Sequence, residues 1–141
     1  MINPTGGNIR NDVGGAGYFG APRKKISDGK TIRYRHRGVD YVCIPKQEVW
    51  MPFTAVIIRY KNPYEGYHGV LFRGKGMVGT LFYVDVDKEM IGKQLKEGEV
   101  VGVAEDLSKK YSNILPHIHF QIDKIDPEIL IGIYRSLRGK A

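Results

Sequence analysis

The sequence contains a single cysteine, Cys43, among its 141 residues, which excludes a disulfide within the chain. Cys43 lies in the apolar run 41–44, so we interpret it as a buried thiol rather than a nucleophile. No apolar stretch is long enough to span a membrane. The N-terminus lacks a charged start followed by an apolar stretch, and we therefore expect synthesis in the cytoplasm without a secretory signal peptide.

Acidic residues are in the minority: the chain has 15 Asp and Glu and 22 Lys and Arg, which gives a formal charge of +7. This sign suits an anionic partner, such as nucleic acid, a membrane surface or an acidic wall polymer, and it is equally typical of a basic, soluble surface. Neither an RNA-binding aromatic signature nor a helix-turn-helix pattern accompanies the charge. We therefore expect no specific nucleic-acid partner and no membrane partner.

Glycine and tyrosine are abundant, with 18 and 9 residues, and with the short apolar runs they favour a β-rich fold with tight turns. Residues 1–31 are punctuated by glycines and are predicted to be an irregular N-terminal segment. Turn signals then separate candidate strands at 32–35, 39–44, 48–51, 55–60, 69–73, 80–85, 100–104 and 117–122.

The last part of the chain has helical signals. Asp126, Pro127 and Glu128 provide an N-cap, a proline at the first helical position and an early acid. Apolar residues follow at helical spacing, which predicts an amphipathic helix over 127–138 that packs its apolar face on the sheet. The predicted fold class is mostly β, a sandwich or barrel, with residues 32–141 forming one domain that includes this helix.

Two of the four histidines lie in the strictly alternating stretch 117–122. On a strand, His117, His119 and Gln121 share one face, and the apolar residues between them share the other, which belongs in the core. The two imidazoles are then ~7 Å apart at their Cα atoms, from ~3.3 Å of rise per residue. A surface pair or a hydrogen-bonded pair is the alternative to a functional one.

A second polar pair is His36 and Asp40, separated by Arg37-Gly38-Val39. In a straight strand the two would share a face at ~13 Å, too far for one ion, but a bend at Gly38 would bring them together. With the histidines of 117–122, they offer two imidazoles and one carboxylate. Three protein ligands with an open position are typical of catalytic zinc, and a non-haem iron triad uses the same groups.

Four motifs in this order resemble those of the LytM/lysostaphin-type zinc peptidases. They are His36–Asp40, the Pro-Phe-x-x-x-Ile stretch at 52–57, the Lys-x-Gly-x-x-x-Gly turn at 96–102, and His117–Phe120. The resemblance implies an antiparallel β-sheet core, often called the duplicated hybrid motif, and cleavage of cross-bridge or stem peptides in bacterial peptidoglycan.

Carried over residue by residue, the resemblance implies that His36, Asp40 and His119 bind zinc and that His117 is catalytic, orienting or deprotonating the attacking water. Active members carry a further catalytic histidine on a middle strand. Asp85 stands at that position here, in the stretch 82–86, and is the second candidate catalytic residue. His68 is interpreted as a solvent-facing or structural histidine, with replacement of the missing histidine as a minor alternative.

The pattern is also similar to the branch of leukocyte cell-derived chemotaxin, which shares His-x-Gly-Val-Asp, a cysteine three residues later and Phe-Tyr without the middle histidine. We expect a zinc-dependent peptidoglycan endopeptidase of bacterial or phage origin that acts at the cell wall. The alternative is a catalytically impaired metal-binding domain that serves as a wall-binding or virion structural component, with phage structural proteins as partners.

Overall fold

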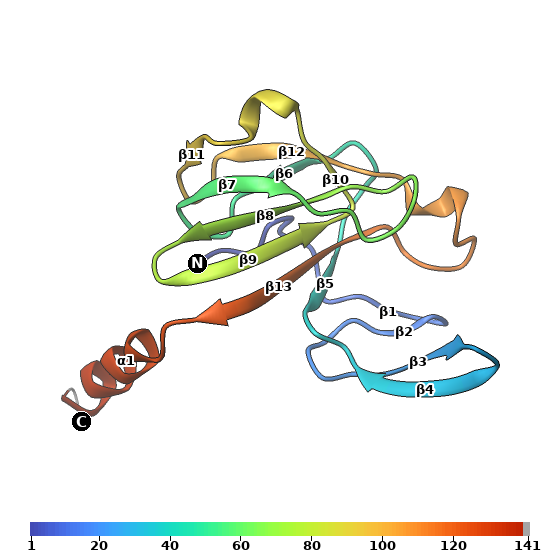
Figure 1. Cartoon of the computed structure of the whole chain (residues 1–141), viewed down its shortest axis with the longest axis horizontal. Helices are drawn as coiled ribbons and strands as arrows, with labels where there is room; N and C mark the ends of the chain where they lie inside the picture. The colour runs from blue at the N-terminus through green and yellow to red at the C-terminus, as the bar shows by residue number, and fades with distance from the viewer. Residues whose placement is uncertain (140–141) are drawn as a thin grey trace.

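Across residues 1–139, which the computed structural model describes, two antiparallel sheets form the body of the protein (Figure 1). The larger sheet has the strand order β11-β7-β8-β9-β13-β5, and the smaller has the order β10-β12-β6. The larger sheet comprises β5 (Val39–Val42), β7 (Ala55–Tyr60), β8 (Gly69–Gly74), β9 (Met77–Phe82), β11 (Gln94–Leu95) and β13 (His117–Ile125). The smaller comprises β6 (Glu48–Trp50), β10 (Val84–Asp85) and β12 (Val100–Ala104). The mostly β, antiparallel fold class is confirmed.

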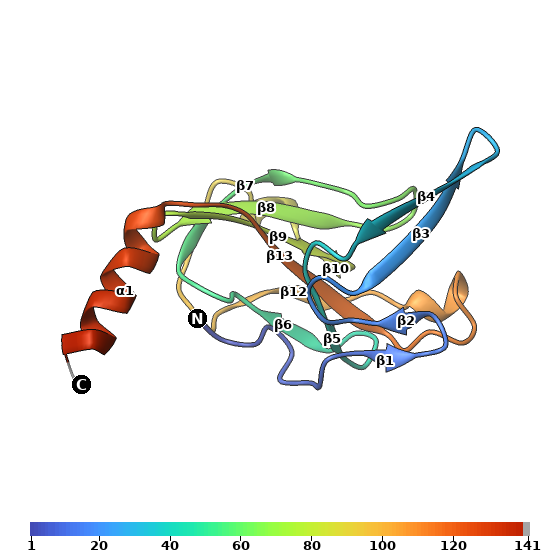
Figure 2. The same ribbon diagram turned by 90° about the horizontal axis from the view of Figure 1, so that it is seen from below.

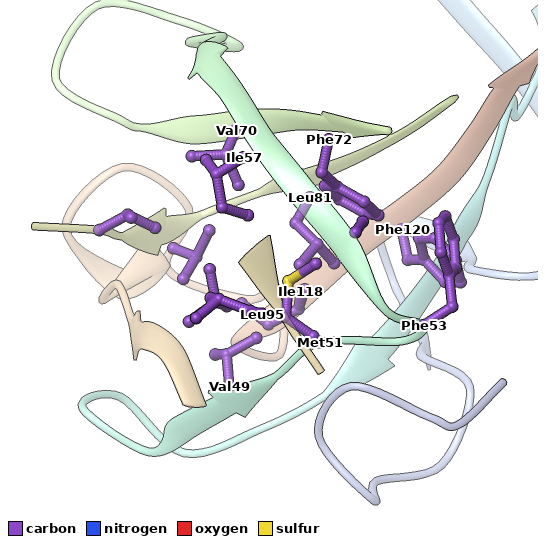
Figure 3. Packing of buried hydrophobic residues seen from close by; sticks show 14 of the residues in the cluster. Val49, Met51, Phe53, Ile57, Val70, Phe72, Leu81, Leu95, Ile118 and Phe120 are labelled. Carbon is purple, nitrogen blue, oxygen red and sulfur yellow. The ribbon is translucent and has the colours of Figure 1, made fainter. Parts of the chain in front are cut away.

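The core lies between these two sheets (Figure 3). Strand alternation turns Ile57, Phe72 and Leu81 of the larger sheet inward, and all three are fully buried. Val49 and Val101 meet them from the smaller sheet. Because β13 contributes Ile118 and Phe120 to this core, its other face is turned away from the core and holds His117 and His119.

Residues 1–31, expected to be irregular, contain three strands. β1 (Asn11–Asp12) pairs with β2 (Gly15–Ala16), and β3 (Pro22–Ser27) forms a hairpin with β4 (Lys30–Arg35). Asp28 and Gly29 both have positive φ, as the tight hairpin turn requires. An antiparallel bridge between Ile9 and Tyr41 connects this segment to β5.

The predicted strand 80–85 is interrupted at Tyr83, whose φ is +70°. β9 ends at Phe82 in the larger sheet, and β10 begins at Val84 in the smaller sheet. The backbone N–H groups of Tyr83 and Val84 both donate to the carbonyl of His68, over 2.8 and 3.3 Å. The chain therefore changes sheets at this residue, and the side chains on its two sides do not share one face.

The C-terminal helix α1 (Pro127–Gly139) forms where it was predicted, but it does not pack along the sheet. Ile129 contacts the core, whereas Ile133, Tyr134 and Leu137 are more than half exposed. Figure 2 shows α1 extending away from the sheets. Two short 3-10 helices, η1 (Lys88–Met90) and η2 (Leu107–Lys109), complete the elements. Among residues 1–139, no helix has the length and apolar character needed to cross a membrane.

Candidate metal centre

His119 and Asp40 are directly opposite each other on neighbouring strands. β13 pairs with β5 antiparallel, with His119 opposite Asp40 and His117 opposite Val42. His119 Nδ1 lies 3.0 Å from Asp40 Oδ1. Opposite residues of an antiparallel pair have close Cβ atoms, so the register alone places an imidazole beside a carboxylate.

His36 completes the cluster from the loop after β4. Its Nε2 lies 3.2 Å from Asp40 Oδ1 and 3.1 Å from His119 Nδ1. The bend predicted at Gly38 is present, and an added Cβ there would lie 2.3 Å from the carbonyl oxygen of Phe120. Glycine thus allows the loop to approach β13 closely enough for His36 to reach Asp40.

Each histidine of the cluster is held through one ring nitrogen. Nδ1 of His36 donates to the carbonyl of Tyr18 over 3.1 Å, and Nδ1 of His117 donates to the carbonyl of Leu115 over 2.8 Å. Nε2 of His119 donates to Oε1 of Gln121 over 2.7 Å. Since these oxygens only accept, the second nitrogen of each neutral ring carries a lone pair that faces the cluster.

The donor atoms fit a divalent metal. Lone pairs of His36 Nε2 and His119 Nδ1 and the anionic Oδ1 of Asp40 converge at 3.0–3.2 Å, an arrangement that repels itself without a cation between the atoms. Tetrahedral zinc with bonds of ~2.0–2.1 Å separates its ligand atoms by ~3.3 Å. Two imidazoles and one carboxylate in this spacing are therefore a site of the right composition and nearly the right size.

The second oxygen of Asp40 is held by arginine. Nε and Nη2 of Arg10 both lie 3.2 Å from Asp40 Oδ2, and Arg23 Nη2 lies at 3.6 Å, too far for a hydrogen bond. Arg10 also donates to Asp12 Oδ1 over 2.6 Å. The two contacts of the Arg10 guanidinium stabilise the charged form of the buried Asp40 carboxylate. Asp40 is therefore an anion with Oδ1 directed at the histidines.

His117 lies at the edge of the cluster, with Nε2 3.7 Å from Asp40 Oδ2. Burial lowers the pKa of His117 below its ordinary value, although the charge of Asp40 opposes this shift. The ring of Tyr83 meets His117 edge-on at 5.3 Å between centroids. His117 is thus a neutral imidazole with a free nitrogen beside the three convergent donors.

The two other candidates lie outside the cluster. Asp85 is exposed on β10 and, within residues 1–139, has no oxygen within 4 Å of a histidine nitrogen. It lines a surface cleft with Lys46 and Tyr67. His68 is paired with Glu105, whose carboxylate accepts from the His68 backbone N–H and contacts Nδ1 at 2.7 Å. Because the chain changes sheets at Tyr83, Asp85 lies in the smaller sheet, outside the cluster.

Sequence reasoning missed the residues that surround the four predicted side chains. Phe82 stacks on His119 at 5.4 Å, since it lies opposite His119 in the register of β9 and β13. Arg10 and Tyr18 come from the segment that was expected to be irregular. These contacts depend on which strands pair and in which register, and a single sequence does not reveal the strand pairing.

Comparison with characterised proteins found relatives in vertebrates. The chain is 31% identical to mouse leukocyte cell-derived chemotaxin-2 over 121 residues, which are 82% of this chain and 74% of the relative. It is 33% identical to the bovine protein over 101 residues, 68% of this chain and 66% of the relative. It is 30% identical to chicken myeloid protein 1 over 133 residues, 89% of this chain but only 38% of the length of that protein. No family model matches the chain.

Solved structures share the fold at low identity. LytU superposes with a TM-score of 0.59 at 15% identity, covering 89% of this chain and 80% of LytU. A zinc-containing peptidase from Vibrio cholerae gives 0.57 at 19%, covering 84% and 35%. The catalytic domain of the antimicrobial peptidase lysostaphin from Staphylococcus simulans gives 0.55 at 19%, covering 78% and 81%. These likenesses establish the architecture around the cluster.

Proposed function

Because the chain belongs to the LytM/lysostaphin-type metallopeptidase family, in the branch of leukocyte cell-derived chemotaxin-2, we propose that it is a zinc-dependent peptidoglycan hydrolase. The observation that supports this most is the convergence of His36, Asp40 and His119 donor atoms with His117 beside them. The proposed substrate is a peptide of bacterial peptidoglycan, and the proposed place of action is the cell wall. A bacterial or phage origin, with virion association, is part of the same proposal.

When bound, zinc supplies acidification of a water and polarisation of the scissile carbonyl. The protein supplies the proton acceptor. His117 is held through Nδ1 by the carbonyl of Leu115, and its lowered pKa keeps Nε2 unprotonated near neutral pH. Nε2 can therefore take a proton from the attacking water and later return it to the leaving amine.

Stabilisation of the developing oxyanion is the weaker part of the site. Asp85 is proposed to have no direct role, because it is exposed and lies in the other sheet. Tyr83 packs against His117, and burial, with the neighbouring Tyr64, raises its pKa, so its phenol stays protonated and can donate a hydrogen bond. Loss of one oxyanion donor costs about 10²–10³ in rate, so we expect slower hydrolysis than in members with two histidines.

Three single variants test the proposal. Purified protein should carry about one zinc by elemental analysis, as expected for a three-ligand site, and should release peptides from purified peptidoglycan, identified by mass. His119→Ala should lose both properties. His117→Ala should keep zinc and lose hydrolysis by about 10²–10⁴-fold, the usual contribution of a general base.

His68→Ala is the matched control, because His68 is bonded to Glu105 and not to the cluster. It should retain zinc and hydrolysis. Full zinc retention by His119→Ala would show that the ligand set is wrong. If the wild type binds zinc but releases no peptide, the protein is better described as a metal-binding domain without catalytic activity that serves in wall binding or in the virion.

A further inference from the structure

The positive charge of the chain is concentrated in the β3–β4 hairpin, residues 22–35. These fourteen positions hold six basic residues and one acid, Asp28, for a net charge of 6 − 1 = +5. The rest of the chain holds 22 − 6 = 16 basic and 15 − 1 = 14 acidic residues, which leaves +2. One tenth of the chain thus carries most of its net charge, and this distribution is not that of an evenly basic surface.

The hairpin is open to solvent on both faces. β3 and β4 pair only with each other, and every residue of β4 is exposed. Figures 1 and 2 show the hairpin extending away from the two sheets. Within residues 1–139, only Arg23 of its six basic residues has a carboxylate partner. In the described residues no carboxylate neutralises the five others, Lys24, Lys25, Lys30, Arg33 and Arg35, although Arg35 donates to the carbonyl of Gly20 over 3.4 Å.

The register places like charges together. Lys24 is directly opposite Arg33, and Arg35 follows on the same face two residues along β4. Like charges opposite each other destabilise a strand pair, and a lone two-stranded hairpin is already marginal in water. Charged residues also protect edge strands from aggregation, but that purpose does not require like charges to lie opposite each other. A bound anion would convert this repulsion into attraction.

We propose that the β3–β4 hairpin binds a linear, anionic polyphosphodiester chain of the cell wall, and this choice of partner rests on the proposed function at the wall. Arginine and lysine both bind phosphate, and Arg33 and Arg35 can do so with two N–H groups. A single-stranded nucleic acid would require open aromatic faces for its bases. Tyr34 is the aromatic residue of the hairpin, and the ammonium of Lys25 lies 5.8 Å above its ring.

The hairpin also leads to the metal centre. Arg35 is followed at once by His36, and Arg23 at the base of β3 reaches Asp40. A polymer held along the hairpin would therefore retain the protein on the wall with the metal centre close to the bound chain. Retention of this kind raises the effective concentration of the peptide substrate without any contact to the peptide.

The test measures binding of purified, soluble polyglycerol phosphate by calorimetry between 20 and 200 mM NaCl. With five free cations and ~0.7 counterions released per contact, log K should fall with log salt with a slope of about −3.5. Lys24→Gln, Lys25→Gln, Lys30→Gln and Arg33→Gln combined should reduce the slope to about −0.7 and weaken binding at least tenfold.

The matched control combines Lys88→Gln, Lys93→Gln, Lys96→Gln and Lys124→Gln, which removes the same charge from exposed positions outside the hairpin. It should stay within twofold of wild type. Equal weakening by both combinations would overturn the proposal in favour of net charge alone. Unchanged binding in the hairpin variant would also overturn it, and so would at least tenfold tighter binding of a single-stranded oligonucleotide of equal charge.

Hydrolysis is measured separately, on peptidoglycan freed of phosphate polymers, where the hairpin variant should equal wild type. If wild type binds the polymer but releases no peptide, the hydrolase proposal fails while the hairpin proposal stands. If wild type releases peptide but does not bind the polymer, the hairpin proposal fails while the hydrolase proposal stands.

Discussion

Removal of the Arg10 guanidinium should destabilise the protein more than any exposed substitution. Arg10 is 4% exposed, and Asp40 is 3% exposed. In Arg10→Leu, Asp40 Oδ2 loses two contacts at 3.2 Å, and Asp12 Oδ1 loses one at 2.6 Å. A buried carboxylate would remain without its main cation.

Removing one partner of a buried ion pair costs ~3–5 kcal/mol. Arg23 Nη2, at 3.6 Å from the same oxygen, can move closer and offset part of the loss. We therefore expect ~3 kcal/mol for Arg10→Leu. With a urea dependence of ~1.5 kcal/mol per molar, the unfolding midpoint should fall by ~2 M. Arg10→Lys keeps the charge but cannot bridge Asp40 and Asp12 with one planar group, so it should lose about half as much.

Urea unfolding followed through the single tryptophan, Trp50, measures this effect. Chelator in every sample removes any contribution of bound metal. Arg59→Leu is the control, because Arg59 is exposed on β7 and should change stability by less than ~0.5 kcal/mol. A loss below ~1 kcal/mol in Arg10→Leu, or an equal loss in Arg59→Leu, would refute the idea that this ion pair supports the metal ligand.

Three further predictions follow from the geometry. Asp85→Asn should keep the rate of peptidoglycan hydrolysis within about twofold of wild type, and Asp85→His should not raise it, because this residue lies outside the cluster. A change of about tenfold in the initial rate of either variant would show that Asp85 does take part. Gly38→Ala should lower the free energy of unfolding by ~1–3 kcal/mol, because its Cβ would lie 2.3 Å from the Phe120 oxygen. It should also weaken zinc binding in a chelator competition. Wild-type values in both assays would show that the loop has room for the Cβ. Burial raises the pKa of Cys43 to about 11, so at pH 8 only ~10⁻³ of the thiol is ionised. A disulfide reagent should therefore label Cys43 more than ~100-fold more slowly in native than in denatured protein. Comparable labelling rates would indicate an accessible thiol.

The cluster itself was largely predictable because its residue types and local spacing carry the information. Alternation in 117–122 placed His117 and His119 on the polar face of one strand, which β13 confirms. The bend at Gly38 was predictable because glycine, the one residue in 36–40 without a Cβ, allows the loop to approach Phe120 closely. The strand at 32–35 was predicted and lies within β4, but β3 and the hairpin pairing were missed, although Asp28-Gly29 is a turn signal, because β3 is basic instead of alternately apolar.

What the sequence determines by itself is therefore local: the ligand types, the face that two histidines share, the helix at 127–138 and the fold class. The tertiary structure alone decides which distant groups meet these residues. It brings Arg10 to Asp40 and Tyr18 to His36, and it turns the chain into the other sheet at Tyr83, carrying Asp85 away. Periodicity describes which face a side chain takes within one element, whereas strand register and a single backbone torsion between elements depend on contacts far apart in the chain.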